Sequence, residues 1–83
     1  MLNKETEEKV DGLLEKYTEL LLGETSDELK KDVLNWIIYT HMAKSMPPLV
    51  KHFNATYPEA KQEIKETIEQ IKALNEAHRG KKD

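Results

Sequence analysis

The chain of 83 residues has no cysteine, and it is poor in the residues that shape sharp loops, with three glycines and three prolines. Without cysteine there is no disulfide bond, no thiolate ligand for a metal ion and no cysteine nucleophile. The glycines stand at positions 12, 23 and 80, too far apart for a phosphate-binding loop. These absences exclude cysteine chemistry and P-loop nucleotide binding.

Long apolar runs are also missing. No run approaches the roughly 18 residues that cross a bilayer. The N-terminal residues lack the apolar core of a signal peptide. We therefore expect a cytoplasmic protein that does not contact membranes. A chain of 83 residues predicts a single domain, residues 1–83, with a small core and little room for a catalytic cleft.

Acidic residues are absent from the middle of the chain. Residues 1–32 carry ten Asp or Glu and five Lys, residues 33–58 carry two Lys and no acid, and residues 59–83 carry six of each sign. The net charge is −3, and binding to nucleic acid requires clustered Lys or Arg, so we expect no nucleic-acid partner. The acid-free stretch, residues 33–58, is where we expect a functional surface.

The apolar residues recur at helical spacing along the whole chain, and no segment alternates as a strand does. The spacing predicts helices at about residues 4–22, 26–45, 48–55 and 58–78. The sequence thus predicts an all-α fold, an antiparallel bundle of three long helices and one short helix, with about residues 79–83 as a frayed tail.

Short local signals predict where these helices begin and end. Gly23 supplies a left-handed stop for the first helix. Thr25 and Glu28 form a capping box, in which Thr25 accepts from the backbone of Glu28 at the start of the second helix. Pro47 and Pro48 end that helix because neither has an N–H to donate, and Pro48 opens the short third helix.

The first and last helices are amphipathic, and each has an apolar stripe that we expect to lie on the core. In the first helix the stripe consists of Thr6, Val10, Leu13, Leu14, Tyr17, Leu20 and Leu21. In the last helix it consists of Ala60, Ile64, Thr67, Ile68, Ile71, Leu74, Asn75 and His78.

The second helix is apolar nearly all round. One face carries an ordinary core set, namely Leu29, Val33, Trp36, Ile37, Thr40 and Ala43. Where a surface helix would carry Lys and Glu, the opposite face carries Leu34, Ile38 and Met42. Two explanations stay open. Either the short helix covers this face with Leu49 and Phe53, or the face is left open for another chain, a second copy or a different protein.

No combination of residues predicts catalysis. Neither Glu-x-x-His nor His-Glu-x-x-His occurs, so a metal site has no ligand pattern to rest on. Ser45 follows His41 by one helical turn, but no nearby acid would orient the imidazole. We therefore expect neither enzyme activity nor a cofactor.

Two histidines and two lysines flank the Pro47-Pro48 bend and offer an alternative function. If the chain folds back there, these side chains can converge on a phosphate or carboxylate group. The candidate anion-binding residues are His41, Lys44, Lys51 and His52. Exposed polar positions beside a turn would give the same pattern.

Three segments resemble a family of bacterial proteins. They are LEKYTELL at residues 14–21, AKSMP at residues 43–47 and YPEAK at residues 57–61. With them, most of the chain is similar to the YusU-like proteins of Bacillus-type bacteria, a family without a characterised function. The resemblance implies a cytoplasmic helical protein and assigns no activity and no site residue.

The sequence as a whole favours a protein–protein interaction module, with self-association through the second apolar face of the second helix as one form of it. The partner is then an unknown protein or another copy of the chain. The predicted contact surface consists of Leu34, Ile38, Met42, Met46, Leu49 and Lys51.

Overall fold

The computed structural model describes residues 1–80, all of whose regular structure is α-helical. Its helices are α1 (Lys4–Leu22), α2 (Asp27–Ser45), α3 (Pro47–Thr56) and α4 (Pro58–Gly80). The predicted all-α fold of three long helices and one short helix is confirmed. Across the described residues, no helix combines the length and apolar character that a membrane span requires.

The helix ends follow the local signals, with two corrections. Gly23 has φ 83° and ends α1 through its N–H, which donates to the Glu19 carbonyl over 2.8 Å. The N-cap of α2 is Ser26, whose hydroxyl accepts from the Leu29 N–H at 3.1 Å, so the prediction of Thr25 as the capping residue is wrong. The helix begins one residue later than the Thr25 box requires, and the Thr25 hydroxyl is buried without a hydrogen-bond partner.

The C-terminal prediction needs the second correction. α4 continues through Arg79 to Gly80, so these two residues are helical rather than frayed, and residues 81–83 lie outside the described part of the chain. At the other bend, Met46 has φ −146° and ψ 68°. This geometry lies outside the helical region, which a following proline disfavours, and it separates α2 from α3.

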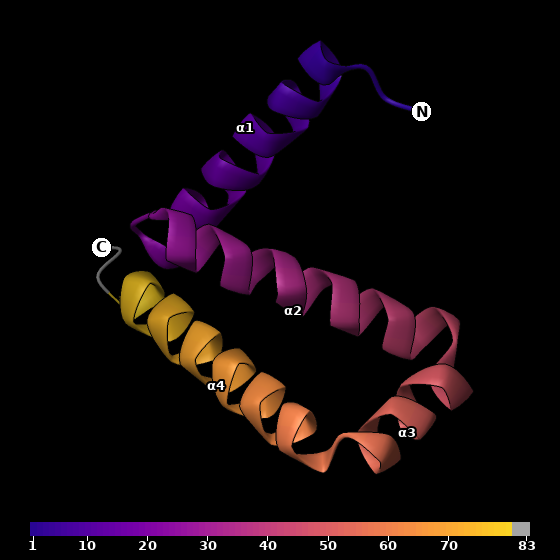
Figure 1. Ribbon diagram of the computed structural model, residues 1–83. Coiled ribbons are helices and arrows are strands. Elements are labelled where there is room, and N and C mark those ends of the chain that lie inside the picture. The colour runs from indigo at the N-terminus through magenta and orange to yellow at the C-terminus, as the bar shows by residue number, and fades with distance from the viewer. Residues whose placement is uncertain (81–83) are drawn as a thin grey trace.

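The helices form an open arrangement rather than a closed bundle (Figure 1). α2 and α4 run in opposite directions, and α3 spans the gap between the end of α2 and the start of α4. α1 contacts both α2 and α4 near its C-terminal end, while its N-terminal half stands away from them. The molecule is correspondingly flat, with extents of 40 × 37 × 20 Å.

The core lies where α1, α2 and α4 meet. Leu22, Val33 and Ile71, one from each long helix, are its buried apolar side chains. Thr18 is buried beside them, and its hydroxyl donates to the Leu14 carbonyl over 2.8 Å, which satisfies its polar group without a partner from another helix. The half-buried residues packed around this centre are Leu14, Leu21, Leu29, Trp36 and Leu74.

The two predicted stripes fare differently. Every member of the α4 stripe is buried or half-buried, so that prediction is confirmed along the whole helix. In α1 the core takes Leu14, Thr18, Leu21 and Leu22, on one edge of the stripe, and the centre of the stripe faces solvent. The prediction that the full α1 stripe lies on the core is therefore wrong for Val10, Leu13, Tyr17 and Leu20.

Candidate interaction surface

The second apolar face of α2 points outward and is partly open. Leu34, Ile38 and Met42 retain 40%, 41% and 39% of their accessible surface. Such values are well above those of the core residue Val33, at 0%. The face is therefore neither sealed by α3 nor fully exposed, and its role as a contact surface for another chain stays a prediction.

The short helix forms one wall of a groove with α2 and α4, named here the α2–α3 groove. The Tyr39 hydroxyl donates to Asn54 Oδ1 over 3.0 Å and ties α3 to α2. The groove has a volume of about 430 Å³ and is largely apolar. It is lined by Asn35, Ile38, Tyr39, Met42, Leu49, Val50, Phe53 and Ile64.

A second apolar groove runs on the other side of α2, against α1, and is named here the α1–α2 groove. Its volume is about 640 Å³. It contains the centre of the α1 stripe, which the sequence predicted to be core, and Leu34 and Ile37 of α2. The lining residues are Leu2, Glu7, Val10, Asp11, Leu13, Leu14, Tyr17, Leu34 and Ile37.

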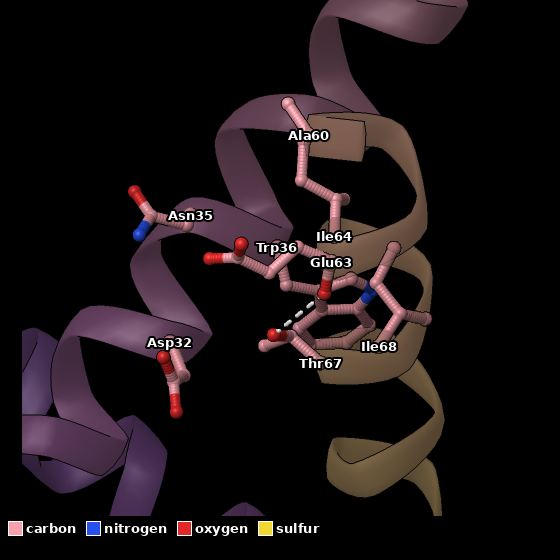
Figure 2. A pocket seen from close by; sticks show the side chains of 8 residues that line it. All are labelled: Asp32, Asn35, Trp36, Ala60, Glu63, Ile64, Thr67 and Ile68. Carbon is pink, nitrogen blue, oxygen red and sulfur yellow. Dashed lines mark hydrogen bonds between the residues drawn. The ribbon is translucent and has the colours of Figure 1, made fainter. Parts of the chain in front are cut away.

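The cleft between α2 and α4 is smaller and is largely filled by an aromatic side chain. Figure 2 shows the Trp36 ring reaching from α2 toward Thr67 and Ile68 of α4, with Asp32 and Asn35 at the outer edge. The Thr67 hydroxyl is occupied, since it donates to the Glu63 carbonyl over 3.0 Å. The volume of this cleft is about 210 Å³, below the roughly 300–1,000 Å³ of ordinary ligand pockets.

One ion-pair cluster fixes the position of α1 against α2. The Lys30 ammonium lies 2.9 Å from Asp11 Oδ2 and 3.8 Å from Glu15 Oε1. The hydrogen bond to the Asp11 carboxylate, helped by the charges of Asp11 and Glu15, raises the pKa of Lys30 above its usual value of 10.5. The cluster links α1 to α2 beside the α1–α2 groove, which Asp11 also lines.

The residues predicted for the anion-binding alternative do not form a shared pocket. His41, Lys44, Lys51 and His52 are all exposed, and none of them lines the three hollows described above. No hydrogen bond or ion pair joins any two of the four within residues 1–80. The anion-binding alternative stays a prediction that no geometry at the bend supports.

The polar groups beside the bend serve the helices. The Ser45 hydroxyl donates to the His41 carbonyl over 2.7 Å, and the Thr56 hydroxyl donates to the His52 carbonyl over 2.8 Å. Within residues 1–80 no three His, Asp or Glu side chains gather as metal ligands would. The remaining residues of the predicted contact surface, Met46, Leu49 and Lys51, are exposed, and Leu49 points into the α2–α3 groove.

The sequence reasoning missed the α1–α2 groove. Val10, Leu13 and Tyr17 lie on an apolar helical stripe, and such a stripe has the same sequence pattern whether it faces its own chain or another. In the structure, the described residues contain thirteen exposed large hydrophobic side chains and three buried hydrophobic ones. A domain of this size cannot bury every apolar stripe that its helices carry.

Comparison with known proteins places the chain among bacterial relatives. It is 70% identical over 80 residues to the uncharacterized protein YusU of Bacillus subtilis, an alignment that covers 96% of this chain and 84% of the relative. No solved structure matches. The model of a family described as "Protein of unknown function (DUF2573)" matches residues 4–81. The resemblance to YusU-like proteins is thereby confirmed, and the chain belongs to the DUF2573 family.

Proposed function

We propose that this chain is a non-catalytic protein-interaction module that binds an amphipathic helix of another protein in the α2–α3 groove. The supporting observation is the open apolar surface of that groove, where Ile38 and Met42 of α2 keep about two-fifths of their surface exposed and Leu49 of α3 nearly half. Apolar patches of this kind mark interaction surfaces in small domains.

The shape and chemistry of the groove favour a helix as the bound element. Three helices form its walls, and a helix that presents apolar side chains at positions i, i+3, i+4 and i+7 fits between such walls. Met42 adds a flexible side chain that adapts to different apolar partners. Residues 33–58 carry Lys44 and Lys51 and no acid, so a partner helix with acidic flanks gains from charge complementarity.

Site-specific photo-crosslinking tests this proposal in living cells. A photoreactive phenylalanine analogue replaces Met42 in the groove, and in a matched control it replaces Ala73, which is exposed on the outer side of α4. The variants are expressed in Bacillus subtilis, the source of the relative that is 70% identical. We expect light to join a discrete second polypeptide to the chain at Met42 and none at Ala73.

The identity and pattern of the products decide the outcome. A crosslinked product from Met42 that disappears when Ile38→Asp is added supports the groove as the binding site. Equal products from Met42 and Ala73, or no product from Met42, would overturn the proposal. A product with the mass of two copies of this chain would mean that the groove binds a second copy rather than another protein.

A further inference from the structure

The N-terminal half of α1 lacks the packing that a helix of its length requires. From Met1 to Leu13, Thr6 is the single residue that is not exposed. Leu13 and Leu20 retain 69% and 66% of their surface, although they lie on the apolar side of the helix. Most of the stability of a protein helix comes from the packing of its apolar face, and this arm has little such packing within its own chain.

The exposed apolar residues of α1 follow the spacing of a coiled coil. Val10, Leu13, Tyr17 and Leu20, named here the α1 seam, are separated by three, four and three residues. Alternation of three and four residues is the heptad pattern of a and d positions, which packs one helix against another along a narrow contact line. The core-facing residues Leu14, Thr18 and Leu21 lie beside the seam, so α1 can contact its own core and a further helix at once.

The size of the molecule indicates how much surface is left to cover. Its accessible surface is 6844 Å², whereas a compact folded monomer of this mass has about 5,100 Å². The radius of gyration is 14.7 Å, against about 11.8 Å for a compact domain of this length. The excess of about 1,700 Å² is spread over the whole open molecule, and it is large enough to include the roughly 800 Å² that each partner loses in a standard interface.

From these observations we propose that two copies of this chain form a symmetric dimer through an antiparallel contact between their α1 seams. Pairing all four seam residues antiparallel sets Val10 against Leu20 of the second copy and Leu13 against Tyr17. Leu34 and Ile37 of each copy, which line the α1–α2 groove, flank this contact. One surface thus serves both copies, as a two-fold interface requires.

Charge favours the antiparallel direction. The first two turns of α1, residues 4–10, carry Glu5, Glu7 and Glu8 against Lys4 and Lys9, so a parallel pair would bring together two helix starts that each have a net charge of −1. An antiparallel pair separates them and also sets the helix dipoles in opposite directions. This inference goes beyond the proposed function and concerns a different surface, since none of the four seam residues lines the α2–α3 groove.

Light scattering of the purified full chain tests the dimer, from about 1 µM to about 500 µM to include weak interfaces of this size. We expect the molar mass to approach twice 9.7 kDa as the concentration rises. Leu13→Asp should return it to 9.7 kDa with the helical circular dichroism kept, because Leu13 is exposed and outside the core. A mass of 9.7 kDa for the wild type at every concentration would overturn the proposal.

Ile38→Asp is the matched control, because it charges the α2–α3 groove and leaves the α1 seam intact. It should keep the mass of the dimer. Loss of the dimer with Ile38→Asp, but not with Leu13→Asp, would overturn the seam contact. Crosslinking from Met42 reports on the proposed function independently. A chain that is monomeric in solution but still crosslinks from Met42 would overturn the dimer and leave the proposed function standing.

Disulfide trapping tests the direction of the contact. Because the chain has no native cysteine, only the introduced cysteines can form a disulfide. Chains with Leu13→Cys and chains with Tyr17→Cys, mixed and oxidised with diamide, should form a mixed disulfide dimer. Val10→Cys alone should not crosslink, because antiparallel pairing sets the two copies of residue 10 about 15 Å apart along the helices, beyond disulfide reach. Efficient crosslinking of Val10→Cys to itself would show a parallel pair and overturn the antiparallel contact.

Discussion

α4 and α1 carry apolar stripes of similar kind, but the α4 stripe is covered by the other helices and most of the α1 stripe is exposed. Along α4, from Ala60 to His78, every stripe residue is buried or half-buried against the other helices. Along α1 the chain covers one edge of the stripe, near the C-terminal end, and leaves the α1 seam in solvent. The difference shows that amphipathicity identifies the face a helix will cover and leaves open which chain provides the cover.

The comparison can be tested most strongly with one large-to-small change in each helix. Ile71→Ala in α4 removes a side chain that is 3% exposed in the core and should lower the free energy of unfolding by about 2–5 kcal/mol. Leu13→Ala in α1 removes an exposed side chain and should change it by less than about 0.5 kcal/mol in the monomer. Chemical denaturation at the lowest workable protein concentration measures both.

Equal losses from the two substitutions would contradict the comparison, because they would mean that the α1 seam is covered by its own chain. A loss of stability from Leu13→Ala that grows with protein concentration would show that a second copy covers the α1 seam, because stability gained from a second copy follows mass action.

The second test compares two glycines of the same region. Gly23→Ala should lower the free energy of unfolding by about 1–3 kcal/mol, since φ is 83° and an added Cβ would lie 2.5 Å from Nδ1 of His78 in α4. Gly12→Ala should instead raise the free energy of unfolding by about 0.5–1 kcal/mol, because Gly12 lies within α1 with open space around it. Thermal unfolding of both variants would show opposite shifts.

His78 gives the control for the costly substitution. In the double variant with His78→Ala, the part of the loss that comes from the ring contact should disappear, and the part that comes from the left-handed backbone should stay. A stabilising Gly23→Ala would mean that α1 and α4 do not meet at this turn.

These residues also show what the sequence could predict. Helix bounds, the Gly23 stop and the α4 stripe follow from spacing and local hydrogen-bonding signals, because such signals act within a few residues. The placement of α1 does not, since it depends on how much core three helices can share. The α2 face around Ile38 was ambiguous for the same reason, because its burial depends on where α3 lies after the Pro47-Pro48 bend.

The third test concerns the attachment of α3 to α2. Tyr39→Phe removes the hydroxyl that donates to Asn54 Oδ1 and should cost about 0.5–1.5 kcal/mol. Tyr57→Phe is the matched control, because Tyr57 is exposed and its hydroxyl has no hydrogen bond within residues 1–80; its effect should be close to zero. Indistinguishable unfolding curves for the two variants would mean that the hydrogen bond does not hold α3 in place.

The smallest effect should come from the ion-pair cluster that holds α1 on α2. Because the pKa of Lys30 is raised in the folded state, first by its hydrogen bond to Asp11, the stabilisation is complete below 10.5 and is lost as the pH rises through the higher folded value. Lys30→Met lacks this term at every pH. The melting temperature of the wild type should therefore exceed that of Lys30→Met at neutral pH and fall toward it above pH 10.5. Added salt should shrink the difference, because the carboxylates of Asp11 and Glu15 are largely solvent-exposed. A wild-type melting temperature equal to that of Lys30→Met at neutral pH and low salt would show that apolar contacts alone hold α1 against α2, and the contrast between α1 and α4 would then rest entirely on core packing.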